Sequence, residues 1–462
     1  MFDVLFVNPS TERKARGTYN REPPMGLLIL ASILRDQGFS VDLLDCSIEN
    51  SAENTLETIS KDYRVIGFTC LTNTYNRTVE LIKIARKAAP KSLFLMGGPH
   101  ASFLSESILD SVPEIDIICK GECENSIVKL FRGVLRNPFS EFLDQIDSFP
   151  LIFKPNVSQL PKGFAVRIDS SQNILFYSDL ISIKDRNLIS IHDSGFPDPV
   201  DIQRIPLPAR DILIPKYFVA NILVNRGCVN RCSFCSRQKL FGKMPRIRSI
   251  QSISEEIDDV VSYSNYKFLN FYDNINMSPK WFREFLSMLI QKRLRIPWGC
   301  ELRADILTAE ETKLMEKAGC VVAATGVESA DETVLKQNFK YQDPEKVKRG
   351  ILFLKEAGIR VQTYFVIGLP GESEQSFQKT LEYLKTLNLD EKDEINFFIA
   401  TPYPGSSLGD MPEKFGARLL INDFDKFDCA NVILEYANLS AEKIFEFKEK
   451  ADKYVREIGA CK

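Results

Sequence analysis

The chain has few histidines and no long apolar run. Only two of its 462 residues are histidines, which excludes a zinc site completed by several imidazoles. No apolar run approaches the roughly 18–20 residues that span a bilayer, and the first residues lack the basic start and cleavage site of a signal peptide. The net charge is only −3, so no charge excess favours nucleic acid or an anionic membrane. We therefore expect a cytoplasmic protein without a membrane span or a nucleic-acid partner.

Cysteine is present in an odd number, eleven, and is scattered along the chain except at one place. This distribution favours a reducing compartment over a disulfide framework. The hydrophobic content of 44% is ordinary for a globular protein. The length predicts roughly three units of about 150 residues each.

Three of the cysteines form the pattern Cys228-x3-Cys232-x2-Cys235. Three thiolates can hold three irons of a 4Fe–4S cluster and leave the fourth iron open to another ligand. A structural zinc ion needs four protein ligands, and neither a second Cys-x2-Cys pair nor a nearby histidine completes such a set. The alternative is a chance group of cysteines, but the spacing favours an iron–sulfur site.

Residues 1–137 alternate between short apolar runs and amphipathic segments. The expected strands are residues 3–8, 40–45, 65–69, 92–96 and 115–120, and the expected helices are residues 25–37, 53–61, 75–89, 102–111 and 125–135. Such alternation, with strands of the buried type, predicts a doubly wound parallel sheet covered on both faces. Ligands of these sheets bind outside the carboxyl ends of the strands.

Polar and glycine-rich motifs follow four of these expected strands. They are Asn8-Pro9-Ser10, the hydroxyl-rich segment from Thr69 to Thr74, Gly97-Gly98-Pro99, and Gly121-Glu122. Each motif alone is typical of an ordinary turn. Four of them at one edge of one sheet favour a ligand site.

Residues 138–217 are rich in proline and predict a connector with a few short strands. Alternation then resumes, with expected strands at 219–225, 268–272, 298–301, 321–325, 361–367 and 395–400, and expected helices at 253–262, 279–292, 309–318, 344–357 and 374–387. Six strands are too few for an eight-fold barrel and predict an open (β/α)6 partial barrel over residues 218–410. Residues 411–462 form a polar tail, with a helix expected over residues 440–457, that we expect to cap the mouth. The cysteine triad follows the first strand, so we expect the cluster at that mouth.

Three motifs of the first domain resemble those of radical S-adenosylmethionine (SAM) enzymes that carry a cobalamin-binding domain. They are Val7-Asn-Pro…Pro-Pro-Met-Gly26, Gly97-Gly-Pro-His-Ala101 and Gly121-Glu-Cys-Glu124, the last with Cys123 where a glycine is usual. The resemblance implies three cofactors, namely a 4Fe–4S cluster, SAM and cobalamin, and an electron donor such as flavodoxin or ferredoxin. Because the Asp-x-His-x-x-Gly motif is absent, we expect no histidine ligand on cobalt.

The resemblance also implies roles for individual residues. The three cysteines of the triad would hold the cluster. The residues implied to contact SAM are Phe234, Arg303, Glu328 and Gly368. The residues implied to contact cobalamin are Pro9, Thr69, Thr72, Thr74, Gly97, Gly98, Pro99, Gly121 and Glu122. Tyr272 and Asp273 are candidates to face the substrate or the SAM ribose.

Structural roles remain open for these residues. Arg303 and Glu328 suit a zwitterion, because an arginine binds a carboxylate in bidentate geometry, but either residue can equally form a surface salt bridge. Phe234 can be a core phenylalanine, and Gly368 can belong to an ordinary turn.

The resemblance implies a methyltransferase that acts on an unactivated carbon or a phosphinate of a small-molecule, natural-product or lipid substrate. One alternative is a radical SAM enzyme that does not methylate, with or without cobalamin, and instead catalyses cyclisation, dehydration or rearrangement. An alternative of another class is a cobalamin or redox sensor without turnover. A SAM-binding arginine and glutamate argue against the sensor.

Overall fold

The computed structural model describes residues 2–10, 23–49, 51–135, 158, 161–172, 174–176, 180, 189–213 and 217–459. The chain divides into two compact units. The first comprises Met1–Thr18 and Pro24–Lys216, and the second comprises Tyr19–Pro23 and Tyr217–Lys462. Across the described ranges, no helix has both the length and the apolar character that crossing a bilayer requires.

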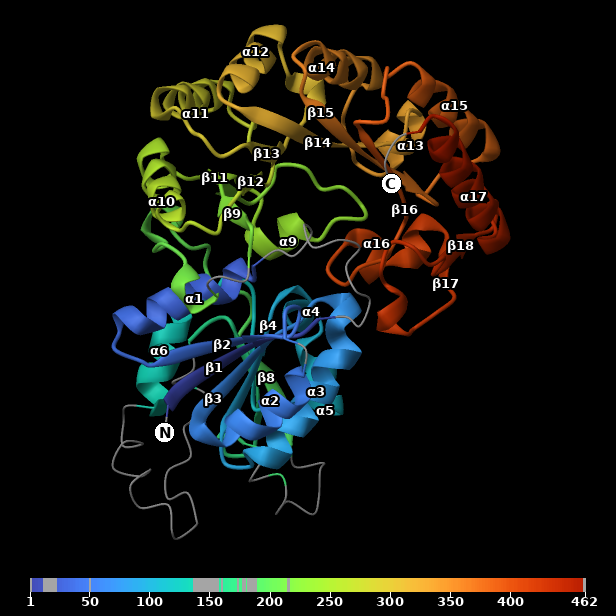
Figure 1. Cartoon of the computed structure of the whole chain (residues 1–462). Coiled ribbons are helices and arrows are strands. Elements are labelled where there is room, and N and C mark those ends of the chain that lie inside the picture. Colours follow the sequence, from blue (N-terminus) through green and yellow to red (C-terminus); the bar gives the residue numbers. More distant parts are fainter. Residues whose placement is uncertain are drawn as a thin grey trace. The chain divides into compact units, whose positions relative to one another are not determined.

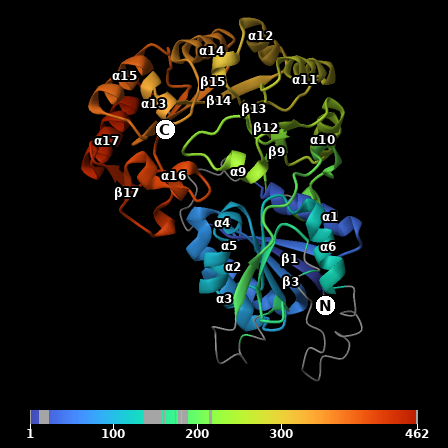
Figure 2. The same ribbon diagram turned by 180° about the vertical axis from the view of Figure 1, so that it is seen from behind.

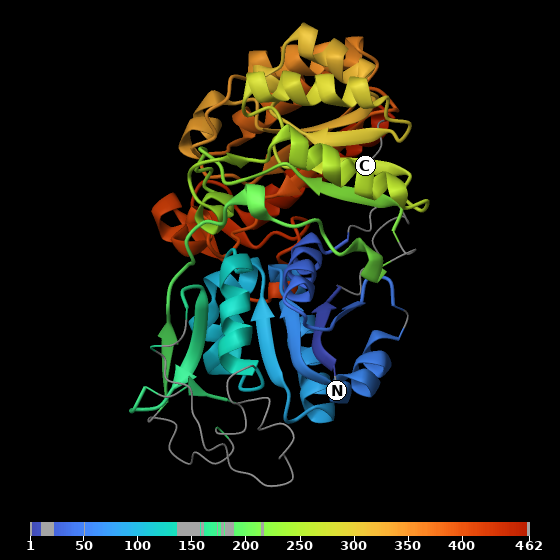
Figure 3. The same ribbon diagram turned by 90° about the vertical axis from the view of Figure 1, so that its left-hand side faces the viewer.

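The first unit is built on a parallel sheet with the strand order β2-β1-β3-β4-β5. Its strands are β1 (Phe2–Asn8), β2 (Val41–Asp45), β3 (Tyr63–Thr69), β4 (Leu93–Gly97) and β5 (Ile117–Cys119). Its helices are α1 (Met25–Asp36), α2 (Ala52–Ile59), α3 (Tyr75–Ala88), α4 (Pro99–Phe103), α5 (Ser105–Ser111) and α6 (Glu124–Leu135). Figure 3 shows helices on either side of these strands.

Alternate strand residues build two separate cores, one on each face of this sheet. On β1, Val4 and Phe6 pack with α1 and α6, whereas Leu5 and Val7 pack with α2, α3 and α5. The two-residue period of a strand thus places successive apolar side chains in different cores. The doubly wound architecture predicted from the sequence is confirmed.

The sheet continues past residue 137, in the segment for which the sequence predicts a connector. Three strands, β6 (Phe164–Ile168), β7 (Ile174–Leu175) and β8 (Ser190–Asp193), join it, and β6 pairs antiparallel with β5, β7 and β8. All five residues of β6 are buried, including Arg167. The Arg167 guanidinium donates to the carbonyls of Leu109, Val112 and Ile115. Because this arginine interrupts the apolar run, the sequence pattern does not predict the strand.

The second unit contains six parallel strands that lie in the sheet in their order along the chain. They are β9 (Val219–Leu223), β12 (Phe268–Tyr272), β13 (Trp298–Glu301), β14 (Cys320–Glu328), β15 (Arg360–Ile367) and β16 (Glu394–Ile399). Helices α10 (Ile250–Ser262), α11 (Pro279–Lys292), α12 (Ala309–Lys317), α14 (Pro344–Glu356) and α15 (Glu374–Lys385) form an arc outside the strands in Figures 1 and 2. This is the open partial barrel that the sequence predicts.

Further elements complete both units. The remaining helices and strands are α9 (Arg237–Phe241), α13 (Glu332–Gln337), α16 (Ser407–Asp410), α17 (Ala441–Glu457), β10 (Asn225–Arg226), β11 (Arg246–Ile247), β17 (Ala417–Leu419) and β18 (Leu434–Tyr436). Short 3-10 turns lie at Ser60–Asp62, Thr72–Thr74, Ile202–Arg204, Arg210–Leu213, Ala304–Ile306, Pro412–Phe415 and Phe424–Lys426. The hairpins β10–β11 and β17–β18 are antiparallel.

Helix α17 packs on β16 and is a sixth outer helix of the barrel. Phe447 of α17 stacks on Phe377 of α15 with 4.2 Å between ring centroids, and both rings are buried. Ile444, Ala451 and Val455 continue the same buried stripe. The sequence predicts a helix over residues 440–457 in a polar tail that caps the mouth, and α17 agrees with that range. The packing instead makes α17 part of the outer helical layer.

The C-terminal segment also fixes the turn that follows β15. The Tyr436 hydroxyl donates to the Gly368 carbonyl over 2.9 Å, and the Gly368 amide donates to the Glu372 carboxylate over 2.5 Å. Glu372 is buried, and burial raises its pKa to about 8. Gly368 has a φ of +80°, which favours glycine at this position.

The packing of α17 predicts a large loss of stability when its central ring is removed. Phe447→Ala should lower the free energy of unfolding by about 3–5 kcal/mol, because it leaves a cavity beside Phe377. The matched control is Phe445→Ala on the same helix, where the ring is 54% exposed and the change should stay within about 0.5 kcal/mol. Chemical denaturation measures both, and equal losses would contradict the packing of α17.

The burial of Glu372 predicts that stability falls as pH rises. The folded state keeps this proton up to a pH of about 8, whereas an unfolded glutamate releases it near 4.3. Between these values the folded state binds more protons, so Glu372 contributes a loss of about 1.4 kcal/mol per pH unit. Urea titrations from pH 5 to pH 8 should show a flatter profile for Glu372→Gln, whereas exposed Glu374→Gln should match the parent slope. Parallel profiles for Glu372→Gln and the parent would refute this assignment.

Candidate functional site

The cysteine triad lies in the loop between the hairpin strand β10 and helix α9, beyond the carboxyl end of β9. Cys228 is buried, Cys232 is partly buried and Cys235 is exposed. Gly227, just before Cys228, has a φ of +87°, and a Cβ there would lie 2.4 Å from the Met244 carbonyl oxygen. The loop therefore needs glycine at this position, because any side chain would push the hairpin away.

Two sets of hydrogen bonds hold this loop in shape. The Gln238 side-chain amide, on α9, donates to the carbonyls of Cys228, Val229 and Asn230 over 3.2–3.3 Å. Ser233 is fully buried, and its amide donates to the Asn338 carbonyl over 3.0 Å. Its hydroxyl donates to the Asn338 side chain over 2.5 Å. The cysteines are thus carried on a backbone fixed from both sides.

The donor set of this loop fits an iron–sulfur cluster. Burial raises the pKa of Cys232 to about 12, and the nearby Cys228 and Cys235 raise it further while Lys340 lowers it. The three thiols therefore lie close enough to interact and would release their protons on binding metal. Among the described residues, no three His, Cys, Asp or Glu side chains converge on a point for one metal ion. A 4Fe–4S cluster does not require such convergence, because each thiolate binds a different iron.

An ion pair faces Cys232 from the end of β14. The Lys340 ammonium group donates to Glu328 Oε1 over 2.8 Å, and both side chains are largely buried. Burial opposes the charge on Lys340, but the Glu328 carboxylate and Cys232 outweigh it and raise the pKa of Lys340. Glu328 has a φ of +60°, a strained conformation of the kind that gathers at functional sites.

Arg303 lies at the carboxyl end of the neighbouring strand β13. Its guanidinium donates to both oxygens of Asp305 over 2.9 and 2.6 Å, and to the Tyr341 carbonyl over 2.9 Å. The Asn276 side chain accepts from the Arg303 amide and donates to its carbonyl, over 2.9 and 2.8 Å. Cys232 is among the groups that raise the pKa of Arg303, after burial, which lowers it, and Asp305, which raises it. Arg303 and Glu328 therefore both lie near the cysteine loop.

Sequence reasoning missed Lys340 and Asp305 at this site. Lys340 follows helix α13, which the sequence pattern does not predict. It belongs to a lysine-rich stretch with no motif of its own. Asp305 stands two residues after Arg303 and could have been found as its ion-pair partner. Lys340 and Asp305 thus add a cation and a carboxylate to Arg303 and Glu328 near the loop.

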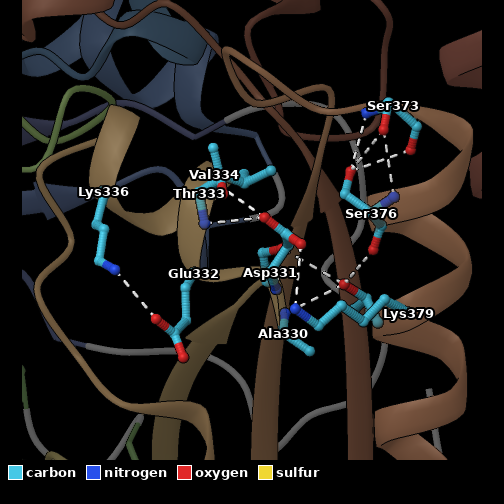
Figure 4. A network of polar contacts seen from close by, with 11 residues as sticks. Ala330, Asp331, Glu332, Thr333, Val334, Lys336, Ser373, Ser376 and Lys379 are labelled. Atoms are coloured by element: carbon cyan, nitrogen blue, oxygen red, sulfur yellow. Dashed lines mark hydrogen bonds and ion pairs between the residues drawn. The ribbon is translucent and has the colours of Figure 1, made fainter.

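A polar network fixes the segment that follows Glu328 (Figure 4). Asp331 caps helix α13 by accepting from the amides of Thr333 and Val334 over 2.9 and 3.2 Å. Its other oxygen accepts from Lys379 of α15 over 3.2 Å. The Ala330 amide donates to Thr380 over 3.1 Å. These contacts anchor the chain just after Glu328 and so help to hold its unusual backbone conformation.

Of the other candidates of this unit, Tyr272 and Asp273 lie at the carboxyl end of β12, and Phe234 lies in the cysteine loop. Asp273 follows β12 with a φ of +74° and is ion-paired to Arg237 of α9. Arg237 also donates to the Asn225 side chain over 3.0 Å, so Asp273 is tied to the cysteine loop. Phe234 is half-buried against Val334, Leu369 and Ala400. Tyr272 is partly exposed on β12. The ligand roles of these residues stay predictions.

The first unit has a topological switch point at its sheet edge, between β1 and β3. Helix α1 after β1 and helix α3 after β3 pack on opposite faces. The loops that lead to them therefore diverge at the carboxyl edge. Ligands of open α/β sheets bind at such a switch point. Pro9 lies in the loop after β1, and the segment from Thr69 to Thr74 begins at the end of β3. This position at the switch point suits a large cofactor such as cobalamin.

Several residues predicted at this edge make contacts within the chain. Thr72 Oγ1 lies 3.2 Å from His100 Nδ1, and Thr74 Oγ1 accepts from the Leu71 amide over 3.0 Å. Gly98 has a φ of +94°, and a Cβ there would lie 2.6 Å from the Cys70 carbonyl oxygen. The fold itself therefore requires glycine at position 98, whether or not a ligand approaches.

The far end of this edge is covered by residues 196–200. A Cβ at Gly121 would lie 2.9 Å from the Phe196 ring, and the Glu122 carboxylate accepts from the Val200 amide over 3.0 Å. Gly97 lies at the end of β4 and Pro99 begins α4. The β1–β3 switch point is therefore better placed for a ligand than the positions of Gly121 and Glu122.

His100 is turned into the protein and is only 1% exposed. Its ring stacks on Tyr75 with 4.6 Å between ring centroids. Burial lowers its pKa to about 4, so the imidazole is neutral at physiological pH. The neutral ring is buried against Thr72 and Tyr75. The absence of a histidine ligand on cobalt stays a prediction.

Two family models match the chain. The B12 binding domain matches residues 17–131, and the radical SAM superfamily matches residues 222–384. An uncharacterized methyltransferase of Pyrococcus horikoshii is 26% identical, over 97% of this chain and 91% of that protein. The anaerobic magnesium-protoporphyrin IX monomethyl ester cyclase of Rubrivivax gelatinosus is 27% identical, over 94% of this chain and 73% of that protein.

A solved structure supports the fold of the whole chain. The radical SAM methyltransferase TsrM from Kitasatospora setae, with cobalamin and a 4Fe–4S cluster bound, matches with a TM-score of 0.69 and 16% identity. The match covers 92% of this chain and 81% of that one. The two domain matches follow one another along the chain in the order that the two sheets do. The chain therefore belongs to the radical SAM enzymes that carry an N-terminal cobalamin-binding domain.

Proposed function

We propose that this protein is a cobalamin-dependent radical SAM methyltransferase. The observation that carries the proposal is the gathering of unlike charges around the cysteine loop. Arg303 from β13 and the Glu328–Lys340 pair from β14 both interact electrostatically with Cys232. A sensor without turnover needs no SAM-binding residues. The amino-acid part of SAM, in contrast, needs both a cation and an anion in its binding site.

The residues divide the work of binding SAM. In this proposal Cys228, Cys232 and Cys235 hold the cluster and leave one iron for the methionine part of SAM. Arg303 and Lys340 bind the carboxylate and Glu328 binds the ammonium group. When bound, the cluster supplies the electron that cleaves SAM, and cobalamin carries the methyl group.

Binding requires a rearrangement of the existing ion pairs. Arg303 is paired with Asp305, and Lys340 is paired with Glu328. A zwitterion can insert between the two pairs because it offers each partner an opposite charge. The site thereby stays electrically balanced before and after binding, which lowers the cost of burying charge.

The relatives favour methyl transfer over cyclisation, because the match covers more of the methyltransferase than of the cyclase. The Pyrococcus methyltransferase matches over 91% of its length, whereas the cyclase matches over 73% of its length. We propose an unactivated carbon or a phosphinate of a small molecule, natural product or lipid as the methyl acceptor. Ring formation is the second candidate, and the likeness to the cyclase favours it over other radical chemistry.

We assign the cofactor of the first unit to the β1–β3 switch point. Pro9 and Thr69 lie at the two loops that border it, and the buried His100 leaves cobalt without a histidine ligand. We further propose a cytoplasmic location, because the thiol-rich cluster loop needs a reducing compartment. A small one-electron carrier such as flavodoxin or ferredoxin would supply the reductant.

Anaerobic reconstitution tests the proposed function. Protein reconstituted with iron, sulfide and cobalamin, and supplied with SAM and reductant, should form 5′-deoxyadenosine and S-adenosylhomocysteine, which chromatography separates. Cys232→Ala should abolish both products because one iron loses its thiolate. The control is Cys300→Ala, which removes a buried cysteine of the strand β13 and should leave the cluster intact. Formation of 5′-deoxyadenosine without S-adenosylhomocysteine would instead support the non-methylating alternative.

The charged residues predict specific losses of SAM affinity. Arg303→Ala and Glu328→Gln should each weaken SAM binding by roughly ten- to a hundred-fold, because each removes a charge-assisted hydrogen bond. Equilibrium dialysis with reconstituted protein measures the dissociation constant, and the iron content should not change. Arg283→Ala is the control, since this arginine pairs with Glu311 on the outer helices. Unchanged affinity in both test variants would return Arg303 and Glu328 to structural ion pairs.

A further inference from the structure

The segment that carries the cysteine triad is strongly basic in a chain of slightly negative net charge. No aspartate or glutamate occurs between Asp211 and Glu255. Seven lysines and arginines fall between Asn225 and Arg248. Such local concentration of one sign of charge creates a surface potential that steers oppositely charged partners.

Some of these basic residues serve the site and are neutralised within the protein. Arg237 is ion-paired with Asp273, and Arg248 is ion-paired with Glu256, with all four side chains largely buried. Arg226 is buried over the Phe241 ring. These three basic side chains are therefore not available to a partner protein.

The outward-facing members surround the cysteine loop. Arg231, between Cys228 and Cys232, and Lys243, on the β10–β11 connection, are both exposed. Val229 is 59% exposed and Met244 is 73% exposed, although both are apolar. We call Val229, Arg231, Lys243 and Met244 the donor face.

The donor face is continuous with the loop that would hold the cluster. The Gly227 backbone packs so closely on the Met244 carbonyl that no Cβ fits between them, so the tip of the hairpin lies beside Cys228. The Arg231 guanidinium sits over the Phe339 ring, 5.1 Å from its centroid, which holds its charge at the surface. Cys235 is itself exposed.

We propose that the donor face is the docking surface for a small acidic one-electron carrier, either a flavodoxin or a ferredoxin. The inference rests on the proposed function, because only an enzyme with a reducible cluster needs such a partner. Arg231 and Lys243 attract the carrier's carboxylates, and the exposed apolar side chains of Val229 and Met244 exclude water from the contact. Transient redox complexes use small contact areas, which suits a face of this size.

Electrostatic docking has a defined kinetic signature. Charges at the rim of an interface mainly set the association rate and its salt dependence. Screening shortens the range of attraction to about 10 Å at 0.1 M ionic strength. Reduction of the cluster by an acidic carrier should therefore be fast at low salt and slow as salt is added.

The test measures cluster reduction directly, so it does not depend on SAM cleavage. Reconstituted protein is mixed anaerobically with reduced flavodoxin, and loss of the cluster's visible absorption is followed by stopped flow. The double variant Arg231→Glu/Lys243→Glu should slow this reduction by about tenfold or more at low ionic strength. The difference should shrink to less than about threefold at 0.5 M salt. Met244→Ser should weaken the complex without changing the salt slope.

Two controls separate docking from damage to the cluster. Lys313→Glu/Arg349→Glu makes the same charge change on α12 and α14, where both residues are exposed, and should leave the rate within about twofold of the parent. Reduced methyl viologen, a small cation, should reduce the parent and the donor-face variant at similar rates.

Three outcomes would overturn the proposal. One is a donor-face variant that behaves like the control pair with flavodoxin. Another is an equal slowing with methyl viologen, which would place Arg231 and Lys243 in the cluster site itself. The third is parent protein whose reduction by flavodoxin is independent of salt. If the cluster is reduced as expected but SAM is not cleaved, the proposed function fails and the docking surface stands.

Discussion

The contact between Lys340, Glu328 and the cysteine loop is the constraint around which the second unit is organised. A buried ion pair of this kind is costly unless its geometry is fixed. The geometry is fixed here by the left-handed backbone at Glu328 and by the polar network that anchors the segment after it. The loop on the other side is fixed by Gln238 and Ser233. Two rigid halves therefore present a charged pair to Cys232.

Most of the fold could be predicted from the sequence because the strands follow simple patterns. The strands β12 and β13 match their predicted ranges, and the other parallel strands differ by a few residues at their ends. Strand ends depend on hydrogen bonds to neighbours that local sequence does not reveal. Strand β6 escaped prediction because a buried arginine interrupts its apolar run. Helix α17 agrees with the helix expected over residues 440–457, but its narrow apolar stripe does not reveal that it packs in the outer helical layer. In both cases the deciding contacts come from residues distant in the sequence, namely the carbonyls that bind Arg167 and the Phe377 ring that packs on α17.

The candidate site could be predicted only where its residues belong to motifs. The cysteine triad is visible from spacing alone, and Arg303 and Glu328 from the resemblance. Lys340 has neither signal, because its place beside Cys232 depends on helix α13 and on the turn that follows it. The glycine-rich motifs are weaker evidence for a ligand site. Gly98 and Gly121 are needed to pack against Cys70 and Phe196, so a glycine-rich edge indicates close backbone packing as readily as a ligand.

The position of α17 in the chain affects how the protein is made. Its partner strand β16 and the ring of Phe377 expose apolar surface until α17 covers them. During synthesis the first unit can complete both faces of its sheet long before α17 leaves the ribosome, since domains generally fold as units from the N-terminal end. The barrel, by contrast, stays open along β16 during this interval. A nascent chain therefore exposes this apolar surface of the barrel until α17 has been synthesised, whereas the first unit has no such interval.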